Sequence, residues 1–208
     1  LELAEQSLRE SMNIDNAPLG YALLAELFIT HDMNLDEAEK LLHQAKELSP
    51  TRQEEAIIEA ALGKIAAERN QPEEELRYFQ RAAALSPDYP GIWYGIATIQ
   101  NQLGQYAEAE QSFKNAIDRE NDIRSYIGLT HIYVQHKQFE QAREFLEQSL
   151  HTMRDPSSSA YIHAILASVF IESGDRRRAQ EMLDEADRIS PGLEVVKAMR
   201  EDLNSLKK

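Results

Sequence analysis

The side chains that could do chemistry are few and widely spaced. Among the six His residues, His131 and His136 lie only five positions apart. Five residues turn a helix by about 500°, so these imidazoles would point from different faces and make a poor metal site. The chain has no Cys, which excludes thiolate ligands, disulfides and Cys nucleophiles together. We therefore expect no metal, no cofactor and no catalytic residue in this chain, which would then not be an enzyme.

Familiar catalytic motifs are also missing from the sequence. It contains no G-x-G-x-x-G, P-loop, H-E-x-x-H or Ser-centred hydrolase motif. Two charge runs remain, Glu73–Glu75 and Arg176–Arg178, each at an expected helix start. The acids suit the positive end of a helix dipole, whereas the arginines oppose it. The exposed arginines are therefore a candidate contact surface for an acidic partner, ranked second to the groove described below.

The charge balance limits the partners. The formal net charge is −14, and phosphate binding depends on Lys and Arg, so we expect no nucleic acid partner. The acidic excess either keeps exposed helix faces soluble or steers a basic partner. No apolar run approaches the roughly eighteen residues of a membrane span, so no membrane insertion is expected. A soluble cytoplasmic or periplasmic location is equally compatible with this composition.

The elements that would position any site recur along the chain. One anchor is a small residue with an apolar residue four positions on and a small one seven positions on. Its copies, including a weaker one with Glu, stand at Ala4, Ala38, Glu75, Ala109, Ala142 and Ala179. The intervals are 34, 37, 34, 33 and 37 residues. A period of this length indicates an array of helical hairpins, each burying its apolar face on a neighbour.

A second pattern precedes these anchors. A large residue is followed four positions later by a small one, as in Trp93 and Ala97 or Tyr126 and Thr130. Together, "W93-x2-I96-A97" and "A109-x3-F113" closely match the pattern W-x₂-L-G-x₂-Y…A-x₃-F. The sequence therefore resembles the tetratricopeptide repeat (TPR) family over essentially its whole length. The resemblance implies an all-α fold, a right-handed α-solenoid of helix–turn–helix hairpins.

The spacing sets the expected boundaries of a single array over 1–208. The expected parts are the second helix of a truncated repeat at 1–16, full repeats at 18–52, 53–89, 90–122, 123–156 and 160–192, and a capping helix at 193–208. Because the first helix of the first repeat is missing, we expect either that the array continues upstream and the chain is a fragment, or that the missing helix was disordered or cleaved. Gly104 and Gly174 suit left-handed helix C-termini.

Three departures from the pattern modify this expectation. Pro72 and Glu75 replace the turn aromatic and the small residue, which predicts a locally loosened repeat. The extra residues 53–55 are expected to lengthen a first helix. The stretch Arg154–Ser159, "RDPSSS", predicts a longer loop before the last repeat.

The resemblance implies a non-catalytic scaffold or adaptor that binds a peptide or helix of a partner protein in a concave groove. By their alignment, the expected groove residues are Leu23, Glu26, Ile57, Lys64, Tyr94, Thr98, Asn101, Arg124, Ile127, His131, Tyr161 and Ser168. The family's Lys–Asn clamp for chaperone C-termini is disfavoured, because only Lys64 and Arg124 fall near its places.

Two other functions stay open. The chain is alternatively a regulatory or targeting module of a larger enzyme, or of a secretion or cell-envelope assembly. It is alternatively a self-associating scaffold, because open solenoid ends can stack.

Overall fold

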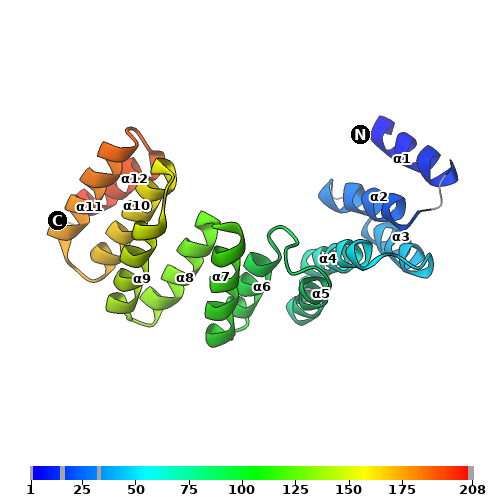
Figure 1. The fold of residues 1–208 in the computed structure, drawn as a ribbon, viewed down its shortest axis with the longest axis horizontal. Helices are drawn as coiled ribbons and strands as arrows, with labels where there is room; N and C mark the ends of the chain where they lie inside the picture. Colours follow the sequence, from blue (N-terminus) through cyan, green and yellow to red (C-terminus); the bar gives the residue numbers. More distant parts are fainter. Residues whose placement is uncertain (1, 15–16, 32–33, 206–208) are drawn as a thin grey trace. The chain divides into compact units, whose positions relative to one another are not determined.

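The computed structural model describes residues 2–14, 17–31 and 34–205, and every regular element within these ranges is an α-helix. In chain order (Figure 1) they are α1 (Glu2–Ile14), α2 (Pro18–Thr30), α3 (Leu35–Glu47), α4 (Arg52–Glu68), α5 (Pro72–Leu85), α6 (Ile92–Gln102), α7 (Tyr106–Glu120), α8 (Ile123–Gln135), α9 (Phe139–Thr152), α10 (Pro156–Glu172), α11 (Arg176–Ile189) and α12 (Glu194–Ser205). The all-α fold of successive hairpins expected from the sequence is confirmed. The parts of the first and last expected helices at residues 1, 15–16 and 206–208 lie outside the described residues.

The chain divides into two compact units, Leu1–Ser112 (unit 1) and Phe113–Lys208 (unit 2). In unit 1, α2 packs against both α3 and α4, and α4 packs against α5. Leu24, Leu42 and Ile58 are fully buried where α2, α3 and α4 meet. Each hairpin therefore buries its apolar face partly on itself and partly on the next one, as expected for a repeat array.

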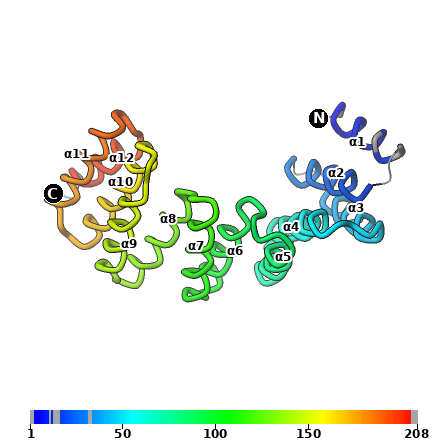
Figure 2. The backbone as a smooth tube through the Cα atoms, viewed as in Figure 1, coloured from blue at the N-terminus to red at the C-terminus, as the bar shows by residue number. Residues whose placement is uncertain are grey.

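Unit 2 follows the same packing rule. Its backbone turns back and forth from α8 to α12 (Figure 2), and α10 contacts α8, α9, α11 and α12. The ring of Phe145 in α9 stacks on Tyr126 at a centroid distance of 5.6 Å and meets the edge of Tyr133 at 6.2 Å. These aromatic contacts fix α9 against α8.

The helix ends show how the turns are made. Gly104 and Gly174, expected at left-handed C-termini, have φ of 74° and 84°. Asn70 and Lys137 occupy the same conformation, with φ of 56° and 57°. A left-handed residue after the first helix of a hairpin therefore does not require Gly, although a side chain there carries a steric cost.

The expectation of a longer loop over Arg154–Ser159 is wrong. Helix α10 begins at Pro156, and the Asp155 carboxylate accepts a hydrogen bond from the Ser158 backbone N–H at 2.7 Å. Asp at an N-cap followed by Pro at the first helical position is a favourable helix start. Four of the residues that suggested a loop, Pro156–Ser159, instead form the first turn of a 17-residue helix.

The weaker repeat forms both of its helices. Helix α4 has 17 residues and includes the extra residues 53–55, as expected, and α5 runs from Pro72 to Leu85. Within the residues described, no helix is both long and apolar enough to cross a membrane.

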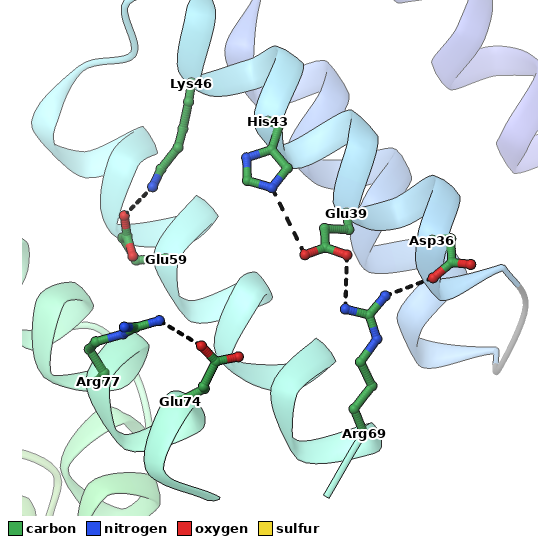
Figure 3. Close-up of polar contacts among 8 residues, drawn as sticks. All are labelled: Asp36, Glu39, His43, Lys46, Glu59, Arg69, Glu74 and Arg77. Carbon is green, nitrogen blue, oxygen red and sulfur yellow. Dashed lines mark hydrogen bonds and ion pairs between the residues drawn. The ribbon is translucent and has the colours of Figure 1, made fainter. Parts of the chain in front are cut away.

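Ion pairs on α3, α4 and α5 add to this apolar packing (Figure 3). Arg69, just after α4, donates to Glu39 at 2.8 Å and to Asp36 at 2.7 Å, both on α3. Lys46 of α3 lies 2.5 Å from the buried carboxylate of Glu59 on α4. The buried Glu59 charge is thus compensated from the neighbouring helix, as burial requires.

Candidate functional site

The first candidate site is a hollow of about 270 Å³ in unit 2, bounded by α8, α10 and α12. We call it the Tyr161 hollow. Its lining consists of Ile127, Thr130, His131, Val134, Tyr161, Ile165, Ser168, Glu172, Val195 and Met199. Four of these residues, Ile127, His131, Tyr161 and Ser168, belong to the expected groove set. The structure thus brings together expected groove residues that are up to 41 positions apart in the sequence.

The lining of the Tyr161 hollow is mainly apolar and accessible. Ile127 is 49% exposed and Tyr161 is 37% exposed, which is high for large apolar side chains. The Ser168 hydroxyl donates to the Ile165 carbonyl at 2.6 Å, whereas the buried Thr130 hydroxyl has no hydrogen-bond partner among the described residues. An apolar concavity with a few polar groups is typical of a site that holds one side chain of a ligand.

The second candidate site lies in unit 1, between the end of α4, the start of α5 and α6. This hollow, which we call the Tyr94 hollow, has a volume of about 550 Å³. It is lined by Ala67, Asn70, Gln71, Pro72, Glu75, Tyr94, Gly95, Thr98, Ile99, Gln102 and Leu103. Tyr94 and Thr98 come from the expected groove set, and the Thr98 hydroxyl donates to the Tyr94 carbonyl at 2.9 Å.

Glu75 gives the Tyr94 hollow a distinct electrostatic character. Its side chain is half-buried, and burial alone raises the pKa of its carboxyl group above the usual value. Removing a carboxylate from water disfavours its charged form unless a cation or a hydrogen-bond donor compensates it. Neither kind of compensation contributes at this side chain.

The other expected groove residues lie outside the linings of both hollows. Glu26 and Lys64 form an ion pair that links α2 to α4. Leu23 is 46% exposed, whereas Ile57 packs against the core of unit 1. The remaining two, Asn101 and Arg124, have different surroundings: the Asn101 side-chain oxygen is buried without a partner in the described part of the chain, and Arg124 donates to Asp122 at 2.7 Å.

The arginine run that opens α11 is largely compensated. Arg177 pairs with Glu181 at 2.5 Å, and Arg178 lies 3.3 Å from Asp175. Arg176 donates to the Leu203 carbonyl of α12 at 3.3 Å. These contacts with acids and a carbonyl reduce the positive charge this run offers to an acidic partner.

The sequence did not predict several residues that line the two hollows. The sequence places Val195 and Met199 in a capping helix, but its periodicity does not show which earlier helix such a cap contacts. Glu75 did carry a signal, since it breaks the small-residue pattern. That signal predicted looser packing rather than a charged lining.

Within residues 2–14, 17–31 and 34–205, no group of three His, Asp or Glu side chains is arranged to hold a metal ion.

Comparison with known proteins gives a family match. A model of the tetratricopeptide repeat matches residues 66–124 and 104–169, which together make up half of the chain. The human protein named Protein O-mannosyl-transferase TMTC1 is 26% identical over 149 residues. That alignment covers 71% of this chain and 15% of the human protein, so the chain spans a small part of that relative's length.

Solved structures share the fold at low sequence identity. YrrB, described as a TPR protein with an unusual peptide-binding site, has a TM-score of 0.64 and 17% identity, covering 95% of this chain and 99% of its own. PilF of Pseudomonas aeruginosa has a TM-score of 0.67 and 18% identity, covering 97% of this chain and 89% of its own. PilW, a type IV pilus biogenesis factor, has a TM-score of 0.65 and 20% identity, covering 95% and 89%.

Proposed function

Because the chain belongs to the tetratricopeptide repeat family, we propose that it is a non-catalytic scaffold or adaptor that binds a segment of a partner protein through the first helices of its hairpins. The observation that carries this proposal is the Tyr161 hollow, where Ile127 and Tyr161 expose apolar surface to solvent beside a recess. Exposed aromatic and aliphatic groups at a recess are frequent anchors of protein interfaces. An apolar side chain of the partner segment would fill the recess, and His131 and Glu172 would contact its polar flanks.

The Tyr94 hollow supplies a second contact in unit 1. It combines amide and hydroxyl groups with an apolar surface from Ala67 and Leu103. A segment with polar and apolar positions suits such a lining better than a purely apolar one. In this proposal each unit holds its own part of the partner through its own hollow.

The proposal is tested by selecting peptides from a displayed random library on the 208-residue chain and measuring their affinities for variants. Tyr161→Ala removes the aromatic wall of its hollow, and we expect it to weaken a selected peptide by about tenfold, as for an interface anchor. Tyr94→Ala should weaken those peptides that also contact unit 1. Circular dichroism should show unchanged helix content, because both side chains lie at the surface of hollows rather than in the core.

Leu3→Ala is the control variant. Leu3 is 80% exposed on α1 and lines neither hollow, so its truncation removes an exposed apolar side chain without touching either site. Equal affinity of the selected peptides for the wild-type, Tyr94→Ala and Tyr161→Ala chains would contradict binding at both hollows.

A second candidate function comes from the human relative. Its name describes a transferase that acts on protein, and the present chain matches 15% of it. In this alternative the repeats hold a protein substrate for an enzymatic domain elsewhere in a longer chain. The complete reading frame decides the matter: if no catalytic or membrane domain flanks this segment, the alternative fails.

Self-association is a third candidate function, because helical arrays can stack end to end. Light scattering over a range of concentrations would show a rising mass if it occurs. A mass that stays monomeric throughout the range would count against it.

A further inference from the structure

Glu75 occupies a position that other repeats give to a small residue. The aligned residues Ala38, Ala109, Ala142 and Ala179 all have 0% exposure, so a methyl group fills this place in four other hairpins. In α5 the side chain is a carboxylate that lines the Tyr94 hollow. The substitution therefore replaces a small, buried packing contact by an acidic group facing a recess.

The Glu75 carboxylate has no partner among the described residues, unlike its neighbour Glu74. Glu74 accepts a hydrogen bond from Arg77 at 2.8 Å, whereas Glu75 forms neither an ion pair nor a side-chain hydrogen bond. No Lys, Arg or His belongs to the lining of the Tyr94 hollow. A half-buried carboxylate without a counter-ion is unfavourable, and a bound cation would relieve it.

The surrounding charge favours a cation from outside. Unit 1 contains 20 acidic and 8 basic residues, a net charge of −12, whereas unit 2 has a net charge of −2. Nearly all of the chain's net negative charge therefore lies in the unit that contains the Tyr94 hollow. Such an imbalance raises the local concentration of positively charged groups and the rate at which they arrive.

We propose that the Tyr94 hollow binds a Lys or Arg side chain of a partner segment, with Glu75 as the counter-ion. The inference rests on the proposed function and specifies the chemistry of its partner, a basic peptide segment. The aliphatic stem of the guest would lie along Ala67 and Leu103, and its charged end would meet Glu75 and the nearby amide groups of Asn70 and Gln102. An Arg side chain suits this lining best, because its guanidinium presents five donors.

The test uses three capped tripeptides, Ala-Arg-Ala, Ala-Lys-Ala and Ala-norleucine-Ala, titrated into the ¹⁵N-labelled 208-residue chain. We expect the two basic peptides to cause saturable amide shifts at Glu75, Thr98 and Leu103, and the uncharged norleucine peptide to cause none. Binding should weaken as the salt concentration rises, because screening reduces the attraction between the charges. Shifts that spread over the whole acidic surface without saturating would overturn the proposal.

Variants separate the Glu75 carboxylate from the general negative charge. Glu75→Gln should weaken the arginine peptide by about tenfold or more, the loss expected for one charge-assisted hydrogen bond. Glu75→Ala installs the residue of the other repeats and should weaken binding as much while keeping the helix content. Glu73→Gln is the matched control, because Glu73 is exposed two positions away and does not line the hollow. Equal losses from Glu73→Gln and Glu75→Gln would overturn the proposal.

The experiment also distinguishes failure of this inference from failure of the proposed function. If library-selected peptides bind and Tyr161→Ala weakens them, but no basic tripeptide shifts the residues of the Tyr94 hollow, only the inference about Glu75 fails. If the arginine tripeptide binds in a Glu75-dependent way but the library yields no peptide that binds the chain, the cation site remains and the adaptor function fails.

Discussion

At the residue scale, the helices approach closely where an aromatic ring meets Gly. A Cβ on Gly95 of α6 would lie 2.8 Å from the ring of Phe79 in α5, and one on Gly63 of α4 would clash with the same ring. Phe113 and Gly128 repeat the arrangement one hairpin later. Two other repeats have Leu42 and Leu146 at the place of Phe79. In the helices that follow them, the positions aligned with Gly95 hold larger residues, Ala61 and Ile165. Volume is thus exchanged between successive hairpins, which keeps their interfaces filled.

Gly95→Ala is therefore expected to destabilise the chain by about 1 kcal/mol. Overpacking typically costs about 1–3 kcal/mol, and the higher helix propensity of Ala returns up to about 1 kcal/mol of this. Urea unfolding measures the difference. Phe79→Leu replaces the ring that the new methyl group would contact by a smaller side chain. The loss of stability from Gly95→Ala should therefore be smaller in that background. Strictly additive effects of the two substitutions would contradict the proposed contact.

At the scale of the element, the starts of α3, α4, α8, α10 and α11 each have a side-chain hydrogen bond at the N-cap. At α4 the Glu54 side chain accepts from the Thr51 backbone N–H at 2.8 Å, and the Thr51 hydroxyl accepts from the Glu54 backbone N–H at 3.3 Å. This reciprocal capping box satisfies two otherwise unpaired N–H groups. The hydrogen bonds from Thr51, first from its backbone and then from its side chain, lower the pKa of Glu54.

Thr51→Ala is expected to cost about 1 kcal/mol of stability at neutral pH, the usual value for losing an N-cap. Because the folded pKa of Glu54 is lowered, its contribution is present above the ordinary Glu pKa and is lost as the pH falls through the folded pKa. Thr51→Ala keeps the backbone N–H that donates to Glu54 and removes only the hydroxyl donor, so the hydroxyl's share of the deficit should shrink in acid. Urea unfolding at neutral pH and at a pH below the folded pKa of Glu54 measures the difference. Thr30→Ala is the control, since Thr30 only donates to the Glu26 carbonyl within a helix. A deficit independent of pH would contradict the role of Glu54.

The sequence was sufficient to predict the helices but not all of their ends or the two hollows. A period near 34 residues fixes hairpins, because each hairpin must bury one face on the next. The start of α10 was missed because Asp, Pro and Ser favour both loops and helix N-termini, and only the geometry at Asp155 distinguishes the two. The hollows were beyond prediction because their volumes depend on side chains from three helices at once. Of the expected groove residues, Tyr94 and Tyr161 line different hollows in different units, and whether they bind a partner is still a prediction.

At the scale of the whole molecule, the chain divides into two compact units. Leu42 in unit 1 and Leu146 in unit 2 take equivalent places in their repeats, and both have 0% exposure. In an array held by contacts between neighbours, stability is approximately a sum of local terms. A core defect should therefore act mainly on its own unit.

Leu146→Ala is expected to destabilise unit 2 by about 2–5 kcal/mol, the usual range for such a truncation. Hydrogen exchange should show reduced amide protection in α8–α11, while amides of α2–α4 keep theirs. Leu42→Ala is the matched variant and should give the reverse pattern. Equal loss of protection in both units from either variant would show that the chain unfolds as one cooperative body.

The wall that α12 contributes to the Tyr161 hollow has a thermodynamic consequence. Val195 and Met199 line the hollow, while Arg200 holds α12 to α11 through Asp184 at 2.8 Å. A guest that touches α12 binds only while that helix is docked, so binding and docking are linked equilibria. Occupancy of the hollow then resists fraying of α12, and any factor that detaches α12 lowers affinity for the guest by the same free energy.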